Sequence, residues 1–404
     1  MNARTLVPSA ALLPLVGFAQ GPLPPPAGVP APDMKSLLEI WNRIGGIESQ
    51  LATVRAENRM LTGLLASSNI NFAWSFKTVD SSVNVGATSL AFGRDGEPAI
   101  AYYNATSSDL RFARRSAGAW TVSTVDSVGL VGEFCSLAIA PDGWAAVAYY
   151  DQTNTNLKYA KFDGVVWQIV TVDNNAGDVG KYASLAFGPD GQPAISYYDT
   201  SNTNLKFARF NGVSWTNSTV DNSTANVGQF TSLAFGPDGQ PAISYYDGAT
   251  NYDLKFARFN GTAWLIEIID GGSPAGQHTS LAFGPDGQPA ISYYQLSPEI
   301  VRIARSTGGS WVLNSAGVAG NTTGVSSLAF GPDGQPAVAF SVSPLLHLEL
   351  SRFNGSSWST SPVNSPSQGG GSPSLAFGPD GQAAVAFSNG QLQFVTKGVF
   401  QPKP

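Results

Sequence analysis

The stretch SLAFGPDGQPAISYYD, residues 184–199, decides the fold because it recurs, with changes, along most of the chain. Each copy opens on a serine, and these serines follow one another at intervals of 47 or 48 residues: Ser89, Ser136, Ser184, Ser232, Ser280, Ser327 and Ser374. A fixed period of this length is typical of architectures in which one supersecondary unit stacks on the next. The sequence therefore predicts seven structural repeats.

Each repeat contains four short segments that are rich in β-branched and aromatic residues and are separated by turn residues. In the third copy these segments are 184–188, 193–199, 204–210 and 215–221. The turn Gly188-Pro189-Asp190-Gly191 favours a tight reversal, because proline presets φ and glycine accepts a positive φ. Asn211-Gly212 is a second hairpin signal. Four antiparallel strands repeated seven times predict an all-β protein, a seven-bladed β-propeller.

The two ends of the repeat region carry complementary fractions of one repeat. The last copy supplies only three segments, near 374–378, 383–388 and 392–397, whereas a fourth segment, Trp74–Asp80 (WSFKTVD), precedes the first copy. An open array would end in polar caps rather than in such fractions. We therefore expect the N-terminal strand to close the last blade, and we assign residues 74–399 to the propeller.

The start of the chain carries a segment that indicates export, followed by a linker. Residues 1–19 have the basic start, the apolar stretch and the small residues of a signal peptide, although a disordered apolar N-terminus is an alternative. Residues 20–32 form a Pro-rich linker, which favours an extended chain. We expect a secreted protein, extracellular or at the cell surface. No other long apolar run is present, so we expect no membrane span.

Residues 33–67 show a helical period. Apolar side chains fall at the a and d positions of about four heptads, with Asn58 at one a position: Leu37, Ile40, Ile44, Ile47, Leu51, Val54, Leu61 and Leu65. This pattern predicts a coiled-coil α-helix that assembles the chain into a parallel oligomer. An amphipathic helix packed on the propeller is the alternative. The mixture of Ile, Leu and Val at a and d does not distinguish a dimer from a trimer.

Composition narrows the functions further. Only 12% of the residues are charged and the net charge is −6, which argues against nucleic acid as a partner because such proteins present a basic face. The single cysteine, Cys135, excludes an intramolecular disulfide and fits a small buried side chain. We expect no metal, no cofactor and no catalytic residue, since the two histidines lack ligand spacing and no nucleophile or phosphate-loop motif occurs. Residues 199–204 carry oxygen ligands for calcium but lack the glycine and bidentate glutamate of a calcium loop.

Candidate binding residues follow from features that are uneven round the ring. The turns between second and third strands and the connections between blades share one face of a propeller, and such loops are the usual place for function. Aromatic residues stand two positions before the anchor serine in four copies: Phe134, Tyr182, Phe230 and His278. The second strand of three copies ends in Tyr-Tyr-Asp, which adds Tyr150, Tyr198, Tyr246, Asp151, Asp199 and Asp247.

Flat aromatic faces beside carboxylates suit sugar rings, which offer C–H faces for stacking and hydroxyls for hydrogen bonding. The sequence therefore predicts a non-enzymatic, lectin-like protein that binds a glycan or surface polysaccharide. A carbohydrate-active enzyme, either a glycosidase or a lyase, and a protein-binding scaffold are the alternatives. At the level of residues, the tyrosines could instead pack between blades, and the aspartates could cap their turns.

The repeat SLAFGPDGQPAISYYD, followed by NLKFARFNG and a spaced tryptophan, resembles tandem repeats in secreted and surface proteins of bacteria. The resemblance covers about residues 74–399 and implies a propeller of unassigned activity. The chain is also distantly similar to sialidase-type propellers, whose Asp-box runs Ser-x-Asp-x-Gly-x-x-Trp. Here Asp190 directly precedes Gly191, so that motif does not match.

Overall fold

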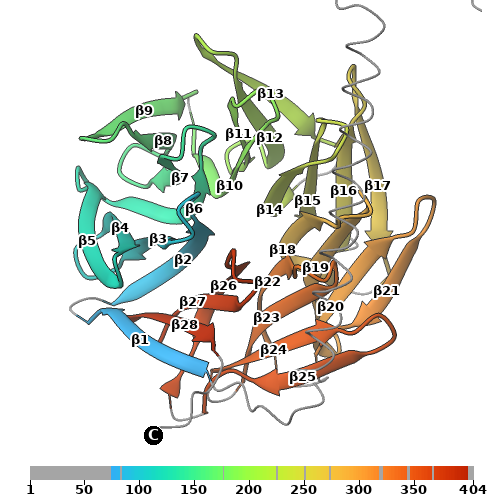
Figure 1. The fold of residues 1–404 in the computed structure, drawn as a ribbon. Helices are drawn as coiled ribbons and strands as arrows, with labels where there is room; N and C mark the ends of the chain where they lie inside the picture. Colours follow the sequence, from blue (N-terminus) through green and yellow to red (C-terminus); the bar gives the residue numbers. More distant parts are fainter. Residues whose placement is uncertain are drawn as a thin grey trace, which may run out of the picture. The chain divides into compact units, whose positions relative to one another are not determined.

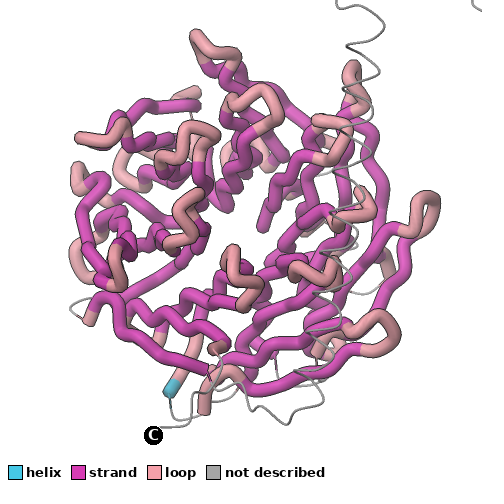
Figure 2. Tube along the Cα trace, viewed as in Figure 1, coloured by secondary structure: helices cyan, strands magenta, loops and turns pink. Residues whose placement is uncertain are grey.

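The computed structural model describes residues 74–398, apart from 82–83, 176, 224–225, 250–251, 273, 318–321, 344–345 and 366–367. The segments expected to form the signal peptide (1–19), the linker (20–32) and the coiled coil (33–67) lie outside these residues. The described part is a seven-bladed β-propeller in which every blade is a four-stranded sheet (Figure 1). Strands and short loops make up almost all of it (Figure 2), and no helix there is long and apolar enough to cross a membrane.

The strands of each blade pair antiparallel in the order of the sequence, except in the last blade. The innermost strands are β2 (Val85–Phe92), β6 (Val131–Ile139), β10 (Val179–Phe187), β14 (Val227–Phe235), β18 (Ala275–Phe283), β22 (Thr322–Phe330) and β26 (Gly371–Phe377). The second strands are β3 (Pro98–Asn104), β7 (Ala145–Asp151), β11 (Pro193–Asp199), β15 (Pro241–Asp247), β19 (Pro289–Leu296), β23 (Pro336–Val342) and β27 (Ala383–Ser388).

The third strands are β4 (Asp109–Ser116), β8 (Asn156–Phe162), β12 (Asn204–Phe210), β16 (Asp253–Phe259), β20 (Glu299–Ser306), β24 (His347–Phe353) and β28 (Leu392–Lys397). The outermost strands are β5 (Ala119–Asp126), β9 (Trp167–Asp173), β13 (Trp215–Asp221), β17 (Trp264–Asp270), β21 (Trp311–Ser315), β25 (Trp358–Pro362) and β1 (Trp74–Asp80). In the last blade β1 pairs antiparallel with β28, from Trp74 opposite Lys397 to Asp80 opposite Leu392.

The expected bounds of the innermost strand are wrong. In the third blade the second, third and fourth strands match the predicted ranges, but β10 begins at Val179 rather than at Ser184. The register of β10 against β11 shifts between Lys181 and Ser184, and Tyr182 has a φ of 55°. This bulge breaks the alternation of polar and apolar residues, so the sequence pattern hides the first half of the strand.

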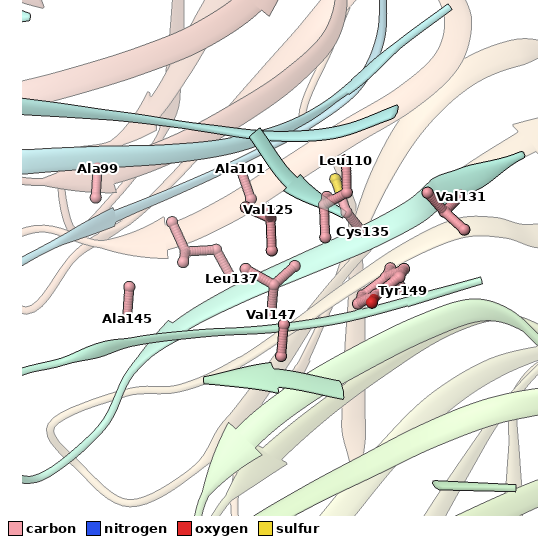
Figure 3. Close-up of a cluster of buried hydrophobic side chains, with 11 residues drawn as sticks. Ala99, Ala101, Leu110, Val125, Val131, Cys135, Leu137, Ala145, Val147 and Tyr149 are labelled. Carbon is pink, nitrogen blue, oxygen red and sulfur yellow. The ribbon is translucent and has the colours of Figure 1, made fainter. Parts of the chain in front are cut away.

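The blades pack face to face through small and aromatic side chains. Every residue of β7 is buried, because both faces of the second strand lie against other strands. Figure 3 shows the cluster between the first two blades, which includes Leu110, Cys135, Val147 and Tyr149. Burial raises the pKa of the Cys135 thiol to about 12, so this cysteine is the small buried side chain that the sequence predicts.

Candidate functional site

Loops of neighbouring blades are joined by hydrogen bonds on one face of the ring. The backbone N–H of Val179, at the start of β10, donates to the carbonyl of Thr155 in the turn of the preceding blade. The N–H of Thr200, in the turn after β11, donates to the carbonyl of Asp178, in the connection that leads into the same blade. The connections between blades and the turns after the second strands therefore share one face, as the sequence predicts.

A hollow of about 200 Å³ lies among the innermost strands β6, β10, β14, β18 and β22. Two successive residues of each strand line it: Phe134, Cys135, Tyr182, Ala183, Phe230, Thr231, His278, Thr279, Val325 and Ser326. The structure thus brings together the four aromatic residues that the sequence singled out. They lie within strands rather than in loops, which is a further consequence of the earlier start of these strands.

Phe134, Tyr182, Phe230 and His278 form a continuous series of rings, which we call the aromatic arc. The ring centroids lie 4.6 Å apart for Phe134 and Tyr182, 4.5 Å for Tyr182 and Phe230, and 4.3 Å for Phe230 and His278. The interplanar angles run from 45° to 54°, so each ring is tilted against the next. Four blades therefore share one aromatic wall.

All four residues of the aromatic arc have a left-handed backbone, with φ between 51° and 55°. Bulky residues seldom adopt this conformation, which costs about 1–3 kcal/mol at a position where glycine would avoid the strain. Each of them lies in the bulge at which the innermost strand shifts register against the second strand. Ser372 of β26 has the same left-handed backbone, with a φ of 47°, so the bulge belongs to the repeat and the aromatic side chains are what distinguishes these four blades.

The wall is not continued round the whole ring. The corresponding residues of β2, β22 and β26 are Ala87, Val325 and Ser372. In β22 the residue with a positive φ is Gly324, which lies next to His278. A Cβ at Gly324 would lie 3.2 Å from His278 Cδ2 and 3.1 Å from the Tyr294 ring. The lining is therefore uneven: β6, β10, β14 and β18 each contribute an aromatic ring, whereas β22 contributes Val325 and Ser326.

The second tyrosines of the Tyr-Tyr-Asp segments lie behind the aromatic arc. The ring centroids of Tyr150, Tyr198 and Tyr246 are 6.1–6.3 Å from those of Phe134, Tyr182 and Phe230. The hydroxyl of Tyr150 donates to Asp178 Oδ1, and that of Tyr198 donates to Asn226 Oδ1, both at 2.7 Å. In this position they support the arc and link each blade to the next.

The aspartates of these segments are buried and cap their turns. Asp151, Asp199 and Asp247 are 0%, 3% and 5% exposed. The Asn154 and Asn202 side chains and backbone N–H groups donate to Asp151 and Asp199, and the N–H of Ala249 donates to Asp247. Burial alone would raise the pKa of Asp151, but hydrogen bonds from Asn154 and Lys158 outweigh it and lower that pKa. Within the described residues, no group of three His, Cys, Asp or Glu side chains could hold a metal ion.

The first tyrosine of each pair is not among the residues predicted from the sequence, and it joins two blades through an aspartate that also binds a lysine or arginine. Tyr149 donates its hydroxyl to Asp126 Oδ2 of the preceding blade at 2.7 Å, and Lys158 Nζ lies 3.1 Å from the same oxygen. The same arrangement links Tyr102, Tyr197, Tyr245 and Tyr293 to Asp80, Asp173, Asp221 and Asp270. The repeated Thr-Val-Asp at the end of the outermost strand was the available signal.

The hollow is uncharged at neutral pH. Burial lowers the pKa of His278 to about 4, and burial together with the neighbouring Tyr198 raises the pKa of Tyr182. The hydroxyls of Thr231 and Thr279 are bonded to the carbonyls of Tyr182 and Phe230 and to Ser196 and Ser244. Chemically, the site offers ring faces, one phenol and one neutral imidazole.

The fold places the chain among seven-bladed β-propellers. No family model and no curated protein matches the sequence. AofleA from Arthrobotrys oligospora is similar in structure, with 12% identity, a TM-score of 0.51, and coverage of 72% of this chain and 90% of that chain. The fungal lectin from Aleuria aurantia, a six-bladed β-propeller, is 18% identical with a TM-score of 0.48 and coverage of 72% and 99%. The α-L-arabinanase of Penicillium chrysogenum is 12% identical, with a TM-score of 0.49 and coverage of 80% of this chain and 97% of that chain. At these identities the likeness concerns the fold alone.

Proposed function

We propose that this chain is a non-enzymatic, lectin-like protein that binds glycan in the axial hollow, against the aromatic arc. The observation that carries the proposal is that four successive aromatic residues, each in contact with the next, line one hollow. The left-handed backbone at these positions belongs to the bulge of the repeat, which Ser372 shares, and it brings the four rings to the hollow.

The chemistry of the hollow supports a sugar as the ligand. Aromatic faces stack on the C–H faces of a pyranose, and the partly exposed Tyr182 and His278 can hydrogen-bond to hydroxyls. Tyr150, Tyr198 and Tyr246 contribute by holding the arc in place. Asp151, Asp199 and Asp247 contribute by fixing the turns of the same face, and we do not expect them to contact the ligand.

Binding fits the hollow better than hydrolysis does. Glycoside hydrolysis uses two carboxyl groups that flank the scissile bond. Among the described residues that line the hollow there is no Asp or Glu. A lyase or glycosidase at this place would therefore need acids from outside the lining.

The segment before the propeller belongs to the same proposal. A signal peptide at 1–19 would export the chain, and a coiled coil at 33–67 would join two or more propellers. Linking weak sites raises the overall affinity for a repetitive surface without any new contact. A glycan-coated surface is such a target.

A glycan and polysaccharide binding screen on the chain from Gln20 tests the proposal. We expect binding that the double variant Tyr182→Ala/Phe230→Ala abolishes. The matched control is Trp144→Ala, because Trp144 is 43% exposed and follows the tight turn between β6 and β7, away from the hollow. Absence of binding by a folded protein, or equal loss in the control, would contradict the proposal. A protein-binding scaffold would then become the better hypothesis.

A further inference from the structure

The aromatic arc serves one hollow, not one site per blade. Each ring of the arc contacts the next at a centroid separation of 4.3–4.6 Å, so no ligand can enter between two neighbouring rings. The hollow measures about 200 Å³, below the roughly 300–1,000 Å³ of pockets that hold drug-sized ligands. Such a space admits one small ring. The ligand number should therefore be one for each propeller.

The lining offers nothing that would balance a charge on the ligand. Its described residues include no Lys, Arg, Asp or Glu, and its only ionisable groups are the thiol of Cys135, the phenol of Tyr182 and the imidazole of His278. The hydroxyls of Thr231, Thr279 and Ser326 are engaged with serines of the neighbouring second strands. A charged group that leaves water without a partner of opposite sign pays a large desolvation cost.

Charged groups near the hollow disfavour anions as well. Lys181 is paired with Asp178, and Asp178 also accepts the hydroxyl of Tyr150, so this lysine is already neutralised. Glu133 directly precedes Phe134 and makes no ion pair with another described residue. The chain as a whole carries a net charge of −6, which adds to the repulsion of an acidic ligand.

Resting on the proposed glycan binding, we infer that the hollow takes a single uncharged sugar ring for each chain and rejects acidic sugars. The ring stacks against the arc, and Tyr182 and His278 hydrogen-bond to its hydroxyls. Val325, on the strand next to that of His278, carries no ring and leaves room for the sugar at this end of the arc. Uronic acids and sialic acids are excluded because their carboxylate would leave water for an uncharged wall that offers no cation.

Titration calorimetry with matched pairs of sugars tests this inference. The probes are galactose with galacturonic acid, glucose with glucuronic acid, and lactose with sialyllactose. We expect a neutral member to bind with a stoichiometry near one for each chain, and its acidic partner to bind at least about tenfold more weakly. A stoichiometry near four, or an acid that binds as tightly as its neutral partner, would overturn the inference.

A variant that gains binding of acidic sugars provides a test that misfolding cannot imitate. Val325→Arg places a cation in the lining and should strengthen binding of the acidic member, whereas Val325→Met changes size without charge and should not. If acidic sugars bind the unchanged chain and Phe230→Ala abolishes that binding, glycan binding stands and the inference fails. If a folded chain binds no sugar in the screen, both fail.

Discussion

The hydroxyl oxygen of Ser374 accepts a hydrogen bond of 2.9 Å from the backbone N–H of Leu90, which links the last blade to the first. The anchor serine of every other copy accepts the same bond from the next blade, at 2.9–3.0 Å. The residue that marks the repeat in the sequence is thus the residue that joins one repeat to another. Because the contact between the last and first blades is equivalent to the rest, the seven blades form a closed series.

Removing the hydroxyl of the anchor serine should lower the free energy of unfolding by a similar amount at every junction between blades. We expect Ser374→Ala and Ser232→Ala each to lower the free energy of unfolding by about 1–3 kcal/mol, because each leaves a partly buried N–H without its acceptor. Urea unfolding followed by tryptophan fluorescence measures both. If Ser374→Ala had no effect while Ser232→Ala destabilised the protein, the junction between the last and first blades would not form in solution.

A glycine at the start of the innermost strand allows two blades to approach. At Gly228, where φ is 110°, a Cβ would lie 2.6 Å from the Cα of Leu205 in the preceding blade. Gly212 has a similar φ of 94°, but the nearest atom to its Cβ would be 3.9 Å away. We expect Gly212→Ala to cost about 1–2 kcal/mol from strain alone, and Gly228→Ala to cost several kcal/mol more. If urea unfolding showed that both variants lose the same free energy of unfolding, the two blades would not approach closely at Gly228.

The pairing of β1 with β28 suggests that the N-terminal strand holds the ring closed. A chain that begins after Asp80 would expose the edge of β28 and lose the packing of Trp74 on the hydrophobic cluster between the sixth and last blades. We expect such a chain to unfold at a lower temperature and to be cut by proteases near β28. A synthetic peptide of residues 74–80 should restore part of the loss, whereas a peptide of the same composition in scrambled order should not. If the shortened chain were as stable as the parent, β1 would not act as a clasp.

The repeat made most of the fold predictable, because the strands that pack between blades must be apolar and the turns need Pro, Asn and Gly. Pro193–Asp199, Asn204–Phe210 and Trp215–Asp221 are therefore found at the expected places. The innermost strand was underestimated because Tyr182 interrupts its alternation with a bulge, which has no composition of its own.

The candidate site was predictable in part. The aromatic arc stood out because one position of the repeat is aromatic in four copies, at Phe134, Tyr182, Phe230 and His278, and not in the other three, so packing of the blades does not require an aromatic residue there. Tyr149 bonds to the preceding blade and Tyr150 to the connection that leads to the next one. This difference could not be predicted from the sequence, because both residues are tyrosine. Only the positions of Asp126 and Asp178 in space show which hydroxyl joins which blade.

The backbone strain in the arc should invert the usual order of two substitutions. In a regular strand glycine is less favourable than alanine by roughly 0.5–1 kcal/mol. Phe230 has a φ of 52°, which glycine adopts freely and alanine does not. We expect Phe230→Gly to be more stable than Phe230→Ala in urea unfolding, and both variants to lose glycan binding. If Phe230→Ala were the more stable of the two, the left-handed conformation would not exist in solution.

The neutral imidazole of His278 makes stability depend on pH. Burial lowers its pKa from 6.5 to about 4, so between these values the unfolded chain binds a proton that the folded chain does not. Stability should therefore fall as the pH falls from about 6.5 to about 4, and the loss from this group should end below pH 4. The loss is at most about 3 kcal/mol, because the ring remains partly open to the hollow. His278→Phe keeps an aromatic ring beside Phe230 and Gly324 but cannot titrate. The difference in unfolding free energy between the two proteins should change across this window, and a constant difference would mean that His278 is not held neutral by burial.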